Sequence, residues 1–431
     1  MMNSIATSGT TCLLCAKQTD SASSSDAVGT SAGRSIVKTA CHHTFHLECI
    51  RRHLDEQSDF PKFRTCAVCP ERVLPLVQVA GETLPSNTLY CESPALVACR
   101  NGDLATIQAM LGRDPGMVRQ QYYSAGTYCN TGLLHIAAEQ GHDRILNLLI
   151  RNQADINGVE GYHGSTPLHL AADGGHTRCM GLLLAAGANP TVTDQQGDTP
   201  LHKAVDAGHI ESLPPLINGG ANINAVNNRG YAPLHKAVLM KQMACLQYLL
   251  SRGADVDYGD AMSYSAACNA ACSGYPDFLE QLIHFKADIN KSGIFGHMPL
   301  HLATEEGHIN CMHILINHGA KIDAANDHGD TSLHMAVWNN NIAAARLLSE
   351  KGASINITDQ DGWAPVHIAA SEGNIEILKH LLERGANIRL LTKNGLSPLG
   401  LSANEGHTNC VQFMHAVFSM TKDPGRLGGL R

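Results

Sequence analysis

Eight cysteine and histidine residues near the N-terminus have the spacing of metal ligands. They form a C-x-x-C pair, then a C-x-H-x-x-H-x-x-C series, then a second C-x-x-C pair. The eight residues are Cys12, Cys15, Cys41, His43, His46, Cys49, Cys66 and Cys69. Thiolate and imidazole are the donor set of zinc, and four such ligands complete one tetrahedral site. We therefore expect two zinc ions.

The segment that must position these ligands is short and holds few apolar residues. Phe45, Ile50 and Leu54 are its expected core, and a stretch rich in Ser and Gly, residues 21–33, is typical of a flexible surface loop. Metal binding should therefore supply most of its folding free energy. We place this zinc module at residues 12–72, between a flexible N-terminus at 1–11 and a linker at 73–92.

The ligand order of three cysteines, two histidines and three cysteines resembles the RING finger of the RING-H2 type. Residues 41–50 are very similar to that family's central stretch. The resemblance implies interleaved sites, the first zinc bound by Cys12, Cys15, His46 and Cys49, and the second by Cys41, His43, Cys66 and Cys69. His42 competes with His43, but it adjoins Cys41, where chelation is more strained. PHD-like and LIM-like fingers are the alternatives, although they place histidine differently.

RING fingers recruit a ubiquitin-conjugating enzyme (E2) charged with ubiquitin and hold the thioester in a reactive pose, which is catalysis by positioning. The resemblance places E2 contacts at Leu14, Ile50 and His53, and a possible ubiquitin contact at Arg72, which is otherwise a solvated charge. The sequence departs from the family at three places. His53 stands where an aromatic residue is common, no Pro lies between the last two cysteines, and Pro70 replaces a frequent cation.

Most of the remaining chain repeats with a period of 33 residues. The repeats open at Gly164, Gly197, Gly230, Gly296, Gly329, Gly362 and Gly395, with Ser263 at the one missing start. The fullest copy contains Thr166-Pro167-Leu168-His169, and it resembles the ankyrin repeat, whose signature is T-P-L-H-x-A. We expect a mostly α-helical solenoid of about ten helix pairs over residues 93–421, followed by a tail at 422–431. The zinc module ahead of it is expected to be a small α+β fold.

The residues of each repeat account for its helices. Pro167 suits the first turn of a helix. Leu378, Leu381 and Leu382 form one apolar face of a second helix. Gly385 then takes the left-handed conformation that ends that helix. Because one helix pair cannot bury its apolar face alone, neighbouring repeats must stack.

Two repeats depart from this pattern. The fourth has Pro214 and Pro215 in its second helix, and an interior Pro costs about 3 kcal/mol or more, so we expect that helix to be short, shifted or kinked. The sixth has lost the T-P-L-H signature, and we expect the stack to continue there with lower local stability. Its Cys268 and Cys272 are better explained as small core residues than as a metal-binding pair.

Twelve histidines fall at two recurring positions in the repeats. Seven occupy the signature: His135, His169, His202, His235, His301, His334 and His367. Five follow the mid-repeat glycine: His142, His176, His209, His308 and His407. In ankyrin repeats such residues form hydrogen bonds between loops, and we favour that role over metal binding or catalysis.

Aromatic residues recur near the hairpin loops, which commonly bind partners in ankyrin proteins. Tyr231, Tyr264, His297 and Trp363 are second residues of their repeats, and Trp338 should lie near Trp363. Exposed aromatic residues are enriched in binding hot spots. We expect these five residues, the aromatic stripe, to bind a partner protein. The alternative is a set of variable loop residues without a shared role.

Composition restricts the class of function. The 31 Lys and Arg against 39 Asp and Glu give a formal net charge of -8, which argues against nucleic-acid binding through a basic face. No apolar run approaches the ~20 residues that span a bilayer. The 15 cysteines, an odd number with two C-x-x-C pairs, favour a reducing compartment, so we expect a cytoplasmic protein.

The leading hypothesis is an E3 ubiquitin ligase, in which the zinc module recruits the E2 and the ankyrin repeats bind the substrate. The alternative is a non-catalytic scaffold whose zinc module only binds a partner. A eukaryotic cytosolic protein and a bacterial effector acting in the host cytoplasm fit the sequence equally well.

Overall fold

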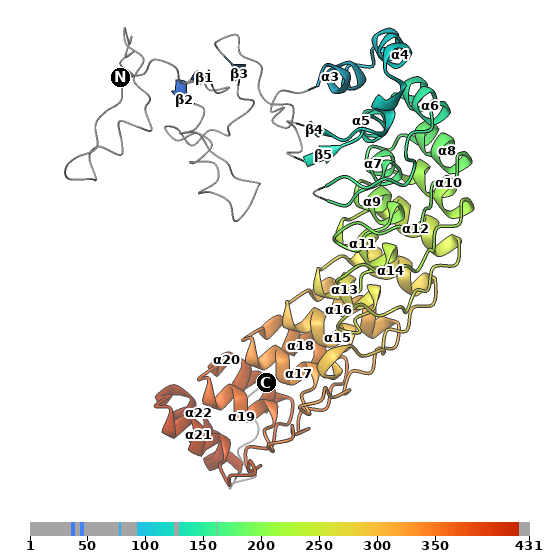
Figure 1. Ribbon diagram of the computed structural model, residues 1–431. Helices are drawn as coiled ribbons and strands as arrows, with labels where there is room; N and C mark the ends of the chain where they lie inside the picture. The colour runs from blue at the N-terminus through green and yellow to red at the C-terminus, as the bar shows by residue number, and fades with distance from the viewer. Residues whose placement is uncertain are drawn as a thin grey trace, which may run out of the picture. The chain divides into compact units, whose positions relative to one another are not determined.

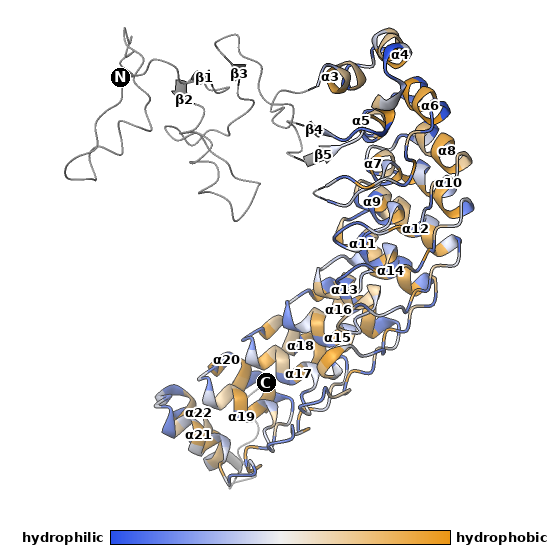
Figure 2. Ribbon diagram, viewed as in Figure 1, coloured by the Kyte–Doolittle hydropathy of each residue, from blue (hydrophilic) through white to orange (hydrophobic). Residues whose placement is uncertain are grey.

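The structure is a computed structural model, and it describes residues 36–38, 44–46, 77–78, 93–124, 129–161 and 163–421. The chain divides into two compact units, Met1–Gln196 and Gly197–Arg431. Helices follow one another in pairs within each unit (Figure 1). Hydrophobic residues are concentrated in these helices, whereas the loops between them are more polar (Figure 2).

Three short strands lie in the part of the chain where the zinc module and linker are predicted. Strand β1 (Ile36–Lys38) pairs antiparallel with β2 (Thr44–His46) and with β3 (Val77–Gln78), so the strand order is β2-β1-β3. The predicted ligand His46 ends β2. The other predicted ligands and contacts lie outside the described residues: Cys12, Leu14, Cys15, Cys41, His43, Cys49, Ile50, His53, Cys66, Cys69 and Arg72. The zinc module stays a prediction.

The N-terminal unit contains the first three helix pairs. They are α3 (Pro94–Arg100) with α4 (Leu104–Arg113), α5 (Leu133–Glu139) with α6 (Asp143–Arg151), and α7 (Pro167–Asp173) with α8 (Thr177–Ala185). A 3₁₀ helix, η2 (Pro115–Arg119), and the paired strands β4 (Tyr122–Ser124) and β5 (Cys129–Thr131) connect the first pair to the second.

The C-terminal unit contains seven further pairs. They are α9 (Pro200–Asp206) with η3 (Ile210–Ser212) and α10 (Leu213–Asn218), α11 (Pro233–Leu239) with α12 (Met243–Ser251), α13 (Ala266–Cys272) with α14 (Pro276–His284), α15 (Pro299–Glu305) with α16 (Ile309–Asn317), α17 (Ser332–Trp338) with α18 (Ile342–Glu350), α19 (Pro365–Ser371) with α20 (Ile375–Glu383), and α21 (Pro398–Asn404) with α22 (Thr408–Thr421). A short 3₁₀ turn, η4 (Ile294–Gly296), precedes α15. The mostly helical solenoid is confirmed.

Local sequence explains most helix ends. Pro167 lies in the first turn of α7, as predicted. Gly385 follows the last residues of α20 with a φ of 88°, the left-handed conformation that ends a helix. The buried face of α20 differs slightly from the prediction. Ile377 is buried together with Leu378 and Leu381, whereas Leu382 is half-buried.

The prolines of the fourth repeat change its second helix as expected. A 3₁₀ turn, η3, occupies the place where the second helix normally begins. Helix α10 starts only at Leu213, so that Pro214 and Pro215 fall in its first turn, where no intrahelical N–H donor is needed. The helix is consequently both shifted and short. The sixth repeat keeps its two helices, so the stack continues there as predicted.

The signature histidines are buried, and their rings form hydrogen bonds between the start of a helix and a loop. In His301, Nδ1 accepts a hydrogen bond from the backbone N–H of Met298 (3.1 Å) and Nε2 lies 3.0 Å from the carbonyl oxygen of Ala324. A carbonyl only accepts, so Nε2 carries the proton and the ring is neutral. Four mid-repeat histidines, His142, His176, His308 and His407, donate from Nε2 to a backbone carbonyl of the preceding repeat. For example, His308 Nε2 donates to the carbonyl of Cys272, in the preceding repeat (3.0 Å). The predicted hydrogen bonds between loops are confirmed, and those of His202, His235 and His334 reach the next repeat.

We predict that acid destabilises the fold through the signature histidines. Burial lowers the pKa of His301 from the ordinary 6.5 to about 4. The unfolded chain therefore binds a proton that the native state excludes, and stability falls as the pH drops from about 6.5 toward 4. The slope approaches about 1.4 kcal/mol per pH unit for each such residue.

Urea unfolding followed by circular dichroism across this pH range measures the effect. His301→Asn should reduce the slope, whereas His313→Asn, which alters an exposed histidine on α16, should leave it unchanged. A pH-independent free energy of unfolding between pH 6.5 and 4 in the wild type would contradict this account.

Candidate partner-binding surface

The aromatic stripe lies in the C-terminal unit. Tyr231, Tyr264, His297 and Trp363 are half-buried, and Trp338, at the end of α17, is 47% exposed. Partly exposed rings offer apolar surface to a partner at little cost in side-chain entropy. As a binding surface, the stripe remains a prediction.

Signature histidines pack against the rings of the stripe and bond to its backbone. The Tyr231 ring stacks on His235 (centroids 6.1 Å apart), and the Trp363 ring packs against His367 (6.3 Å). The Nε2 of His235 lies 3.2 Å from the carbonyl oxygen of Tyr264, to which it donates as the neutral ring. Buried imidazoles thus fix both the backbone and the rings of the residues that the sequence singles out.

The two tryptophans of the chain form one aromatic surface. The rings of Trp338 and Trp363 are stacked, with centroids 6.2 Å apart and planes at 28°. The sequence places them near each other, and this contact is confirmed. Offset aromatic pairs of this kind are worth about 0.5–1.5 kcal/mol beyond their buried area, so each ring restrains the orientation of the other.

Tyr264 and His297 are more engaged in the fold than the other members of the stripe. The Tyr264 hydroxyl donates to the carbonyl of Ile294 (3.4 Å), and its ring covers Gly293, where a Cβ would lie 2.1 Å from the ring. His297 Nε2 lies 3.1 Å from the side-chain amide nitrogen of Asn326. These two residues therefore pack neighbouring hairpin loops together as well as contributing surface.

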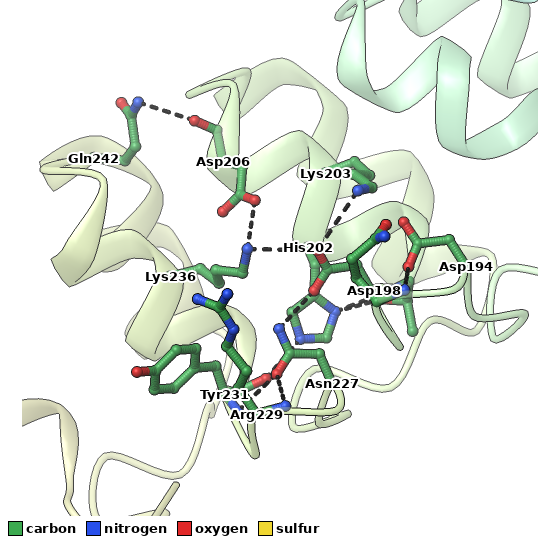
Figure 3. Close-up of polar contacts among 12 residues, drawn as sticks. Asp194, Asp198, His202, Lys203, Asp206, Asn227, Arg229, Tyr231, Lys236 and Gln242 are labelled. Atoms are coloured by element: carbon green, nitrogen blue, oxygen red, sulfur yellow. Dashed lines mark hydrogen bonds and ion pairs between the residues drawn. The ribbon is translucent and has the colours of Figure 1, made fainter. Parts of the chain in front are cut away.

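A cluster of charged side chains, which the sequence analysis does not identify, lies on the fourth and fifth repeats (Figure 3). Asp198 lies 3.6 Å from Lys203 and 3.4 Å from Lys236, and Lys236 also contacts Asp206 at 2.6 Å. The side-chain amide of Asn227 donates to Asp198 at 2.7 Å. A sequence signal exists, since both lysines directly follow a signature histidine. Their acidic partners lie up to 38 residues away.

The cluster stabilises a buried carboxylate. Burial raises the pKa of Asp198, but the hydrogen bond from Asn227 and the charges of Lys236 and Lys203 outweigh it, so the net shift is downward. Within the described residues, Oδ1 of Asp206 is buried without a hydrogen-bond partner.

Seven cysteines of the repeats are free thiols: Cys99, Cys179, Cys245, Cys268, Cys272, Cys311 and Cys410. Cys268 is fully buried, and burial raises its pKa to about 11, whereas Cys272 is half-buried. Both belong to α13, so the interpretation of Cys268 as a core residue is confirmed. In the described part of the chain, no three His, Cys, Asp or Glu side chains converge on a possible metal position.

Comparison with known proteins identifies the family. The family described as ankyrin repeats (3 copies) matches residues 95–194, 175–260, 267–359 and 351–416. These matches cover well over half of the chain, and the chain belongs to the ankyrin-repeat family. No curated protein matches it. Across the described residues, none of the helices is both long and apolar enough to cross a bilayer.

Among solved structures, the chain is similar to the ankyrin repeat domain of Bcl-3, described as a unique member of the IkappaB protein family. The two share 28% sequence identity with a TM-score of 0.47. The similarity covers 51% of this chain and 100% of that one.

We predict that Lys236→Met destabilises the C-terminal unit by about 3 kcal/mol, because it leaves two partly buried carboxylates without their shared cation. Lys379→Met is the matched control. Lys379 pairs with Glu376 on an exposed surface, and such a pair contributes about 0.5 kcal/mol or less. Urea unfolding of both variants measures the difference. Equal losses in the two variants would rule out a special role for the cluster.

Proposed function

We propose that the protein is a RING-type E3 ubiquitin ligase whose ankyrin repeats bind the substrate. The observation that carries the proposal is the ordered series of eight zinc-type ligands in one chain with a long ankyrin array. Ankyrin repeats imply a protein partner, because stacked repeats present an extended surface of loops and first helices. The ligand series supplies the second activity, recruitment of the charged E2.

In this proposal, catalysis is positioning. Leu14, Ile50 and His53 contact the E2, and Arg72 contacts ubiquitin. Two zinc ions fix the loops that carry these residues, because so small a module has little apolar core of its own. The ankyrin array raises the local concentration of a bound substrate near the thioester, which makes transfer effectively intramolecular. No residue of the chain forms a covalent bond with ubiquitin in this scheme.

A non-catalytic scaffold is the second candidate, and two residues favour it. His53 stands where an aromatic residue commonly contacts the E2, and Pro70 stands where a cation often contacts ubiquitin. In that case the zinc module binds a partner without activating a thioester. The aromatic stripe serves either function, because both require a protein held on the repeats.

We predict that the purified chain binds about two zinc ions and discharges ubiquitin from at least one charged E2. Leu14→Ala should abolish discharge while leaving the zinc content unchanged, since Leu14 is not a ligand. Cys41→Ser should reduce both. Elemental analysis and a single-turnover discharge assay over a panel of E2 enzymes measure these outcomes.

Discharge that survives Leu14→Ala would remove the proposed E2 contact. Two bound zinc ions without discharge across the whole panel would instead favour the scaffold. Restoring the common residues with His53→Trp and Pro70→Arg is then the informative experiment, because recovered discharge would locate the loss at those two positions.

We predict that a substrate protein bound to the repeats changes the intrinsic tryptophan fluorescence of the chain. The only two tryptophans are Trp338 and Trp363, so any shift in emission or in quenching by acrylamide reports on the stripe. Trp363→Ala should weaken binding by at least about 2 kcal/mol if it is a hot spot. The control is Val159→Ser, which removes an exposed apolar side chain (47%) in the N-terminal unit. Binding that is insensitive to Trp363→Ala would exclude the stripe.

A further inference from the structure

The hairpin loops of the C-terminal unit end in a regular row of exposed side chains. The residue just before the opening position of each repeat recurs every 33 residues. In five successive repeats it is Arg229, Met262, Phe295, His328 and Asp361, and all five are exposed. We call these residues the tip row. They differ from the aromatic stripe, which lies two or more residues further along each repeat.

Backbone hydrogen bonds hold the tip row together. The carbonyl of each row residue accepts a bond from the next hairpin loop: Arg229 from Ala261 (3.3 Å), Met262 from Ile294 (2.8 Å), Phe295 from Asp327 (2.9 Å), His328 from Gln360 (3.0 Å) and Asp361 from Lys393 (3.0 Å). The loops are also in close contact, since a Cβ at Gly230 would lie 2.2 Å from the nitrogen of Ala261. The row is therefore a preorganised surface with a fixed interval.

The centre of the row is apolar. Met262 is 57% exposed and Phe295 is 56% exposed, and Ile294 beside them is also exposed. The other three row residues are charged or polar, as is usual at hairpin loops. Two large apolar side chains on adjacent loops expose surface to water, which is unfavourable unless a partner covers it.

Phe295 also adopts a strained backbone conformation. Its φ of 58° and ψ of 20° are left-handed, a region that a bulky residue rarely enters and that costs about 1–3 kcal/mol. Its ring stacks on the neighbouring row residue His328, with centroids 6.4 Å apart. Glycine would fit this backbone without strain. Strained backbone conformations cluster at binding and active sites. The strained Phe295, which presents an exposed aromatic ring, therefore indicates a binding surface.

The two ends of the row carry opposite charges. Arg229 precedes Met262 at one end of the row. Asp361 lies at the other end, separated from Phe295 by His328. Adjacent packed helices are about 8–10 Å apart, and an extended chain advances about 3.3 Å per residue, so each repeat corresponds to about three residues of an extended ligand. A complementary ligand carries an acidic side chain opposite Arg229 and a basic side chain opposite Asp361.

We propose that the tip row binds an extended segment of a partner protein. That segment has an acidic residue, two large apolar residues at successive intervals of about three, and a basic residue about six positions beyond the second apolar one. The apolar residues cover Met262 and Phe295, and the charged residues set the register. The inference goes beyond the ligase proposal and does not depend on it.

The test uses a synthetic fluorescent peptide with Glu, Leu, Leu and Arg at these intervals, and a second peptide with the reversed order, because an extended chain runs in either direction. Fluorescence anisotropy with the full-length protein measures the dissociation constant. Phe295→Gly should weaken binding at least about tenfold while keeping or raising the melting temperature, since it relieves the left-handed strain. Met262→Ser should weaken binding similarly.

Controls separate the row from exposed apolar surface in general. Leu391→Ser removes a 58% exposed side chain of the same unit outside the row and should leave binding unchanged. Arg229→Glu should weaken binding, and a peptide with Lys in place of Glu should restore it. Failure of both peptides to bind, or equal loss in Leu391→Ser and Phe295→Gly, would overturn the proposal.

Two further measurements test for a second copy as the occupant and separate this proposal from the ligase proposal. Self-association of the wild-type chain that Phe295→Gly abolishes would identify a second copy as the occupant and would also overturn the peptide proposal. Ubiquitin discharge in the absence of substrate involves only the predicted zinc module, so row variants should leave it unchanged. Failure of the ligase proposal is thereby distinguishable from failure of this one.

Discussion

A neutral, buried imidazole that bridges two loops is the interaction on which the repeat array depends. Its Nδ1 accepts the N–H that would otherwise be unsatisfied at the start of a helix, and its Nε2 donates to a loop carbonyl, which for three of these histidines belongs to the following repeat. His334 shows both bonds, to Thr331 and to Trp363. No apolar residue can replace this arrangement, because two buried backbone groups would lose their partners.

The same interaction orders the predicted binding surface. A signature histidine that donates to the carbonyl of Tyr231, Tyr264 or Trp363 fixes the backbone from which that aromatic side chain projects. Backbone hydrogen bonds between successive hairpin loops likewise fix the spacing of the tip row. Rigid spacing lowers the entropy that a ligand must lose on binding. The interactions that hold the repeats in stack therefore also hold side chains at intervals that an extended protein segment can match.

The two parts of the chain obtain their stability from different sources. The repeats bury apolar helix faces against their neighbours, so each repeat depends on those beside it. The predicted zinc module has few apolar residues, and its folding free energy would come from thiolate and imidazole bonds to metal. A change that removes a predicted zinc ligand and a change that unpacks a repeat should consequently act independently on stability.

Much of this protein was determined by the sequence alone. The period and signature residues specify the helix pairs, and Pro214 and Pro215 specify the shifted helix. The repeat pattern also places Trp338, at the end of one repeat's first helix, near Trp363 in the next repeat. Tertiary structure decided the rest. The charge cluster joins Asp198 to Lys236 across repeats, and the exposure of Phe295 depends on a left-handed backbone. Such features depend on how hairpin loops meet in space, which no local propensity encodes.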